Sequence, residues 1–148
     1  MVVRYRDGMI PVVPSAPELV ALSGEVAEAY EHRFDVLDFT GALEHVWELV
    51  RALNRFVEAR APWELAKSTE PEAVAALDEA LATLCEGVRA LAVLLWPYLP
   101  SRAPLMLAAV GEAADDIGFD RAVLGSGSGR TVDTSGGSLF PRVDAPAA

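Results

Sequence analysis

The strongest constraint on the fold is a regular apolar stripe in the second half of the chain. Seven residues follow one another at alternating steps of three and four: Val74, Leu77, Leu81, Leu84, Val88, Leu91 and Leu95. Residues at this spacing share one face of an α-helix, so the stripe predicts a long helix over residues 71–96 whose apolar face lies in a core. Pro97 and Pro100 are expected to end it, because proline is not tolerated in a helix interior.

A second stripe predicts another long helix over residues 38–60. It consists of Phe39, Leu43, Val46, Val50, Leu53 and Val57. Pro62 ends or bends this helix, since the residue before a proline is pushed away from helical geometry. Shorter patterns predict helices over 17–32 and 101–112, and no segment sustains the period-two alternation of a strand. The predicted fold is all-α, an antiparallel bundle of four to five helices.

The composition changes near the C-terminus. Residues 125–138 read "GSGSGRTVDTSGGS", which is typical of a flexible linker. We therefore predict a helical domain over residues 1–124 and a flexible linker and tail over residues 125–148. The apolar pair Leu139 and Phe140 follows the linker and is expected to dock on an apolar surface, either of the bundle or of a domain outside this chain.

Composition excludes several classes of protein. The longest apolar run, "ALAVLLW", is far shorter than the roughly 20 residues of a membrane span, and no signal peptide is recognisable. The single cysteine, Cys85, is expected to be buried and inert, and it suits a reducing, cytoplasmic location. His32 and His45 complete no metal-ligand spacing, the pair Asp115 and Asp116 is expected to be solvated, and no nucleophile has an arguable base. Neither a metal site nor a catalytic site is predicted.

The net charge of −10 disfavours nucleic-acid binding, which uses clustered basic residues. A local patch can nevertheless face a phosphate. Four of the twelve basic residues fall in or beside the stretch 54–67, "NRFVEARAPWELAK": Arg51, Arg55, Arg60 and Lys67.

Trp63, in the same stretch, has two possible roles. It is either a core residue at a helix joint or an aromatic platform that stacks an unpaired base beside its phosphates. Trp47 borders Val46 and Val50 of the second stripe, so it is expected to face the core.

The segment "ALNRFVEARAPWELAK" (52–67) closely resembles the anticodon-binding domain of bacterial methionyl-tRNA synthetases, where an Asn-Arg-aromatic helix end leads to Ala-Pro-Trp-x-Leu-Ala-Lys. Three other segments are similar to motifs of that family and occur in its order: "RYRDGMIP" (4–11), "LATLCEGVRALAVLLWPYLP" (81–100) and "GSLFPRVD" (137–144). Synthetases for leucine, valine, isoleucine and cysteine share the helical class, but "APWELAK" is most similar to the methionine enzyme.

The resemblance implies a domain that recognises the CAU anticodon loop of methionine tRNA. Trp63 matches the family tryptophan on which an anticodon base stacks, with Pro62 beside it. Asn54 and Arg55 also match the family pattern and are expected to support this contact. The candidate phosphate contacts are Arg51, Arg60 and Lys67.

The chain also departs from the family. The nucleotide-binding fold and its two signature motifs are absent, so ATP and methionine are expected to bind a separate catalytic domain, and no cofactor is expected in this chain. The family motif Gly-Asn-Leu-x-x-Arg, whose Asn and Arg also contact the anticodon, would precede residue 1. The chain is therefore expected to be the C-terminal piece of a synthetase.

An alternative is a helical structural or interaction domain that has kept the fold and lost tRNA binding. The missing motif and the acidic charge favour this alternative. The intact "APWELAK" disfavours it.

Overall fold

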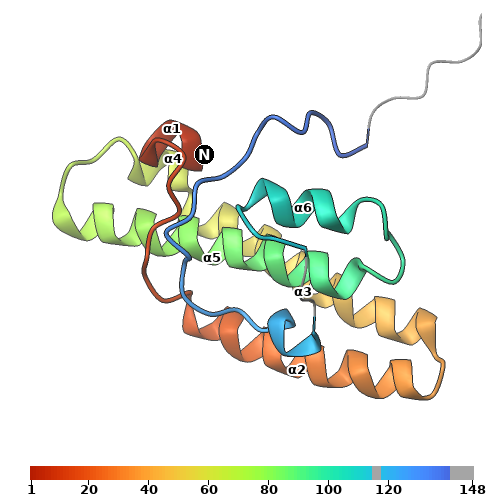
Figure 1. Cartoon of the computed structure of the whole chain (residues 1–148). Coiled ribbons are helices and arrows are strands. Elements are labelled where there is room, and N and C mark those ends of the chain that lie inside the picture. Colours follow the sequence, from red (N-terminus) through yellow and green to blue (C-terminus); the bar gives the residue numbers. More distant parts are fainter. Residues whose placement is uncertain (115–117, 141–148) are drawn as a thin grey trace, which may run out of the picture.

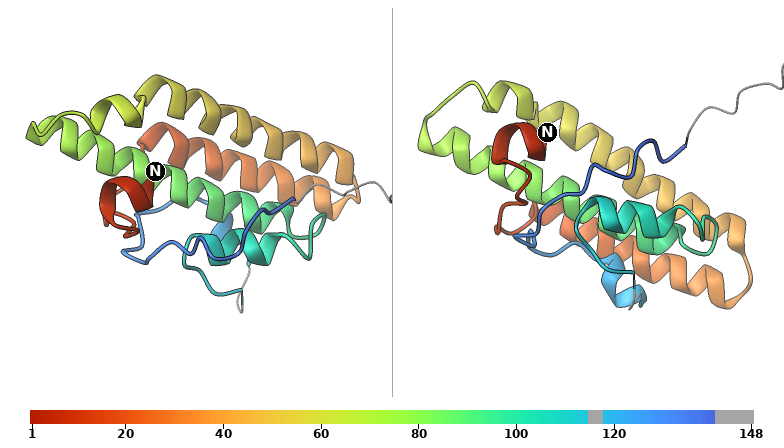
Figure 2. Two further views of the ribbon diagram at one scale, coloured as in Figure 1. Left: turned by 90° about the horizontal axis from the view of Figure 1, so that it is seen from above. Right: turned by 45° about the horizontal axis from the view of Figure 1, so that its top comes forward.

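The computed structural model describes residues 1–114 and 118–140, and over these residues the chain is helical without a β-strand (Figure 1). The long helices α2 (Pro17–Asp35), α3 (Phe39–Arg60) and α5 (Pro71–Leu95) pack side by side, with α3 antiparallel to the other two (Figure 2). Shorter elements surround them: α1 (Val2–Arg6), α4 (Pro62–Leu65), α6 (Ala103–Ala109) and the 3₁₀ turn η1 (Phe119–Ala122). The predicted all-α antiparallel bundle is confirmed.

Local sequence signals explain where the long helices begin. Asp38 is the N-cap of α3, and its carboxylate accepts a hydrogen bond from the backbone N–H of Gly41 at 2.9 Å. Pro17 and Pro71 occupy the first turns of α2 and α5, where a missing N–H costs nothing. None of the helices in the described part of the chain is long and apolar enough to cross a membrane.

Helix α5 is the centre of the molecule, and its burial differs from the prediction. It contacts α2, α3, α4, α6 and η1. Within the predicted stripe, only Leu77 and Leu81 are fully buried, and Val74 is exposed. The other four members are half-buried: Leu84, Val88, Leu91 and Leu95. Most of the fully buried residues of α5 lie outside the stripe, because the surrounding elements cover the other faces of the helix.

A buried ion pair on α5 holds the C-terminal segment. Arg89 Nη2 lies 2.7 Å from Glu86 Oε2, and the same guanidinium donates to the backbone carbonyls of Arg121 and Val123. Glu86 in turn accepts the backbone N–H of Gly125 at 3.0 Å. Both charges are therefore compensated, as burial requires.

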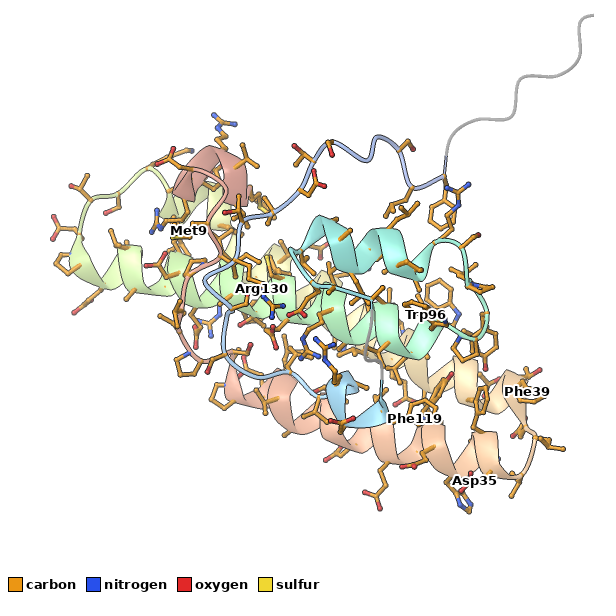
Figure 3. The ribbon with its side chains drawn as sticks, in the orientation of Figure 1. Met9, Asp35, Phe39, Trp96, Phe119 and Arg130 are labelled. Atoms are coloured by element: carbon orange, nitrogen blue, oxygen red, sulfur yellow. The ribbon has the colours of Figure 1, made fainter. Side chains whose placement is uncertain are left out.

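The start of the predicted linker differs from expectation, because it is packed. Residues 125–132 run beside residues 8–15: Ile10 N–H donates to the carbonyl of Arg130 at 2.9 Å, and Gly127 N–H donates to that of Val13 at 2.9 Å. Met9, labelled just below α1 in Figure 3, forms an antiparallel bridge with Thr131, and Arg130 is labelled over α5. The packed unit thus continues past the predicted boundary at residue 124.

The expected docking of Leu139 and Phe140 is only partly seen. Leu139 is half-buried and lines a surface pocket together with Leu105, Ala108 and Ala109 of α6. Phe140 is 63% exposed and so does not dock on the bundle. Its docking on a surface outside this chain, the other expectation, stays a prediction. Residues 141–144 of the "GSLFPRVD" segment lie outside the described residues.

Candidate nucleic-acid interface

A rigid bend joins α3 to α4. Ala61 adopts the left-handed conformation, with φ 41° and ψ 62°, and its N–H still donates to the carbonyl of Val57 at 3.0 Å. Pro62 excludes the helical conformation at the preceding residue, so α3 stops and a new turn begins at the proline. Pro62 itself is buried. The bend is therefore anchored in the bundle by its proline.

Trp63 follows this anchor and is 45% exposed. A tryptophan in a core would be almost wholly covered, so the structure excludes the interpretation of Trp63 as a core residue. A half-exposed ring beside a buried proline has one side available to another molecule. Aromatic rings presented in this way can stack unpaired bases.

The expectation for Trp47 is wrong. Its side chain is 52% exposed, on the outer face of α3. The helix is rotated relative to the predicted stripe, so Leu49 and Phe56 are buried, while Val50 and Val57 are half-buried. Trp47 therefore projects into solvent about 20 Å along the helix from the bend.

Two of the predicted phosphate contacts are engaged in ion pairs. Arg60 Nη2 lies 3.2 Å from Glu79 and 3.8 Å from Glu18, and its guanidinium lies 5.3 Å from the ring centroid of Phe56. Lys67 Nζ lies 2.8 Å from Glu64. A phosphate would have to compete with these carboxylates.

Arg51, Asn54 and Arg55 are exposed on α3, and Arg55 also lines a surface groove with Glu18, Leu19 and Leu22 of α2. Within residues 1–114 and 118–140, neither of these two arginines has a carboxylate partner. They are therefore the available cations on the last turns before the bend. Glu58 is exposed on the same stretch and reduces the local positive charge.

Helix α1 lies at the same end of the bundle as α4 (Figure 1). A surface pocket there is lined by Arg4, Tyr5 and Arg6 of α1, together with Ala66, Ser68, Val74 and Leu77. Arg6 is held by Asp78 of α5, with Nε 2.5 Å from the carboxylate. The guanidinium carbon of Arg4 lies 5.6 Å from the ring centroid of Tyr5. Arg4 is thus a cation at the α4 end of the bundle that the sequence analysis did not identify as a candidate. The "RYRDGMIP" resemblance was the available signal, but it gave no position relative to Trp63.

The structure also bears on the metal-ligand and cysteine candidates of the sequence. No group of three or more His, Cys, Asp or Glu side chains among them could hold a metal, and Asp115 and Asp116 lie outside the described residues. Cys85 is buried as predicted, and burial, with a smaller effect of Glu86, raises the pKa of its thiol to about 11. A thiol with such a pKa is not a nucleophile near neutral pH.

Curated relatives align with nearly the whole chain. It is 31% identical over 153 residues to methionine–tRNA ligase of Listeria innocua, covering 98% of the chain and 23% of the relative. The methionine–tRNA ligase of Streptomyces coelicolor is 32% identical over 155 residues, covering 97% of the chain and 29% of the relative. The chain matches one domain of the methionyl-tRNA synthetases. It spans only about a quarter of the length of these relatives, and no protein-family profile matches it.

Solved methionyl-tRNA synthetases share the fold. The ligand-free enzyme of Mycobacterium tuberculosis superposes with a TM-score of 0.83 at 27% identity, covering 99% of the chain and 30% of that enzyme. The same enzyme bound by methionyl-adenylate gives a TM-score of 0.85, covering 95% of the chain and 28% of the enzyme. The resemblance identified from the sequence motifs is therefore confirmed for the family.

Proposed function

We propose that the chain is the anticodon-binding domain of a methionyl-tRNA synthetase and that it recognises the CAU anticodon loop of methionine tRNA. One observation carries the proposal: Trp63, within "APWELAK", is 45% exposed directly after the buried Pro62. A base flipped from the anticodon loop stacks on this ring. Base–aromatic stacking of this kind contributes about 1–3 kcal/mol to binding.

The neighbouring polar residues have different roles. Arg55 and Asn54 lie on the exposed last turns of α3 and support the stacked nucleotide, and Arg51, one turn earlier, contacts a phosphate. Arg60 and Lys67 contribute less than their charge implies, because both are paired with carboxylates. Their main role is to fix the two sides of the bend.

The remainder of the enzyme supplies the chemistry. ATP and methionine bind a catalytic domain that is a partner of this chain, and the whole enzyme acts in the cytoplasm. This assignment rests on the match to synthetases that are about four times longer than the aligned region.

The test is a titration of a methionine anticodon stem-loop with three proteins: the unmodified chain, Trp63→Ala and Trp47→Ala. Both tryptophans are about half-exposed, so both substitutions remove a similar surface ring. Trp63→Ala is expected to weaken binding by about 1–3 kcal/mol, and Trp47→Ala to leave it unchanged. Equal affinity of the unmodified chain and Trp63→Ala would contradict the proposal. Absence of binding, both by the unmodified chain and by a chain extended upstream through the Gly-Asn-Leu-x-x-Arg motif, would favour the alternative of a domain that has lost tRNA binding.

A further inference from the structure

A surface groove runs between α2 and α3, which lie side by side (Figure 2). We call it the α2–α3 groove, and it is lined by Glu18, Leu19 and Leu22 of α2 and by Ala52, Arg55, Phe56, Ala59 and Arg60 of α3. Its volume of about 370 Å³ falls within the range of roughly 300–1,000 Å³ found for ligand sites. The groove can therefore hold a ligand of the size of a nucleobase.

The floor of the α2–α3 groove is apolar and fixed. Leu19, Ala52 and Phe56 are buried in the main core of the bundle. Leu22 is half-buried and Ala59 is exposed, so both can contact a bound molecule. Such a floor favours a ring or an aliphatic group over an ion that keeps its full hydration shell.

Arg60 presents its guanidinium at the end of the groove next to the bend. The guanidinium carbon lies 5.3 Å from the ring centroid of Phe56, and Nη2 lies 3.2 Å from Glu79. These two contacts fix the guanidinium, whereas Glu18 is 3.8 Å away, beyond hydrogen-bond distance. The Arg60 side chain is still 37% exposed. Because guanidinium planes stack unpaired bases as aromatic rings do, Arg60 is a preformed stacking platform.

Arg55 supplies the free charge of the groove. It is exposed, and in the part of the chain that the structure describes it has no carboxylate partner. The carboxylates of Glu18 and Glu79 are the partners of Arg60 and not of Arg55. The groove thus combines an apolar floor and a stacking platform with one cation that is available to a phosphate.

The α2–α3 groove adjoins the Trp63 site. Arg60 precedes Trp63 by three residues, so their Cα atoms lie at most about 11 Å apart. Bases on Arg60 and on Trp63 can therefore belong to nearby nucleotides of one strand. Proteins that bind single-stranded nucleic acids combine stacking side chains with a basic groove in this way.

We propose that the α2–α3 groove binds a second unpaired base of the same RNA loop, beside the base that stacks on Trp63. The base packs on Arg60 and against Leu22, and the phosphate between the two nucleotides faces Arg55. The inference rests on the proposed function of the chain as an anticodon-binding domain. It adds α2 to the RNA-binding surface.

The first test uses the CAU stem-loop and versions of it in which each unpaired loop nucleotide in turn lacks its base. These RNAs are titrated with the unmodified chain, with Ala59→Leu, which fills the groove, and with Ala21→Leu. Ala21→Leu is the matched control, because Ala21 is exposed on α2 and does not line the groove. Base removal at two positions is expected to weaken binding to the unmodified chain and to the control by about fivefold or more each. In Ala59→Leu, one of the two effects should disappear.

Two results of this test would overturn the proposal. One is a pattern of base-removal effects in Ala59→Leu that equals the pattern of the unmodified chain. The other is a dimer that the chain forms without RNA and that Ala59→Leu dissociates, because a second copy would then occupy the groove.

Trp63→Ala distinguishes this proposal from the anticodon-binding proposal. It should abolish the effect of base removal at the other position and keep the effect at the groove position. If only the groove effect is missing, the groove proposal fails and the Trp63 contact stands. If Trp63→Ala changes neither effect, the proposed role of Trp63 fails instead.

The second test measures the phosphate contact. Arg55→Gln is expected to reduce the slope of log affinity against log salt by about 0.7, the value for one phosphate of a single strand. Arg33→Gln is the control and should leave the slope unchanged, since Arg33 pairs with Asp38 at the other end of α2. In a chain that already carries Ala59→Leu, Arg55→Gln should no longer change the slope. An equal reduction with and without Ala59→Leu would show that Arg55 contacts a phosphate elsewhere, and would overturn the proposal.

Discussion

Glu112, which follows α6, forms ion pairs with two arginines from later parts of the chain. Its carboxylate lies 2.6 Å from Arg121 Nη2 and also pairs with Arg130. Burial by itself raises the pKa of the Glu112 carboxyl, but hydrogen bonds from Arg130 and Arg121 outweigh it, so the pKa lies below its ordinary value of 4.5. A lowered folded-state pKa stabilises the fold above the unfolded-state pKa, and this contribution is lost as the pH falls through the folded-state value.

We therefore expect the free energy of unfolding to decline as the pH is lowered from about 5 to about 3, and to decline less in Glu112→Gln. Urea denaturation at several pH values measures this. Glu25→Gln is the control, because Glu25 is an exposed carboxylate on α2 without a basic partner among the described residues. If Glu112→Gln and the unmodified chain lose stability in parallel, Glu112 does not carry this pH dependence.

Trp47 and Trp63 show how far the environment of a single residue can be predicted from the sequence. Trp63 could be singled out because proline chemistry predicts a bend there and the surrounding motif resembles a family. Trp47 was misjudged because α3 contains two overlapping apolar stripes. The predicted stripe and the buried face share Val46 and Leu53. Periodicity alone does not show which of the two stripes packs against the neighbouring helices.

At the scale of elements, the crossing of α3 and α5 depends on a glycine. An added Cβ at Gly87 would approach the two Cδ atoms of buried Leu53 to 2.6 and 2.7 Å, whereas one at Gly24 in α2 would meet nothing within 4 Å. Alanine favours a helix over glycine by about 1 kcal/mol at both positions. Overpacking a core costs about 1–3 kcal/mol, and this cost applies only at Gly87.

The two substitutions are therefore expected to have opposite signs. Gly24→Ala should stabilise the chain by about 0.5–1 kcal/mol, and Gly87→Ala should destabilise it by up to about 2 kcal/mol. Chemical denaturation of both variants provides the measurement, with each serving as the control for the other. A stabilised Gly87→Ala variant would show that Leu53 moves aside freely and that the crossing is not tightly packed.

The elements themselves were largely predictable. The helices expected over 38–60 and 71–96 are found at Phe39–Arg60 and Pro71–Leu95, because their lengths are set by prolines and by an N-terminal Asp, all visible in the sequence. The packed course of residues 125–132 was not predictable from composition. Gly127 lies so close to the carbonyl of Pro11 that no side chain fits there. The sequence alone does not distinguish a glycine required by close packing from a glycine in a flexible linker.

At the scale of the whole molecule, the acidic surface limits RNA binding. Most described basic side chains are paired with carboxylates, as are Arg33, Arg60 and Lys67. The net charge of −10 repels phosphates at long range, most strongly at low salt. Affinity must then come from local contacts at the Trp63 end, where stacking has little dependence on base identity.

We therefore predict weak binding of a methionine anticodon stem-loop and poor discrimination between CAU and a single-base variant. Stacking on Trp63 provides affinity, but base identity is read by hydrogen bonds to base edges. The resemblance places the Asn and Arg that make such bonds in the motif that precedes residue 1. A chain extended upstream through this motif is expected to regain these hydrogen bonds.

The measurement is a set of four titrations, in which the chain and its extended form each bind the CAU stem-loop and the variant. The extension is expected to increase selectivity, with each recovered base contact worth about 0.5–3 kcal/mol. An extended chain in which the motif's Asn and Arg are both changed to Ala is the matched control, since it keeps the length of the extension and removes the hydrogen-bonding groups. It should lose the gain in selectivity. Equal selectivity of the chain and its extended form would show that recognition does not depend on that motif.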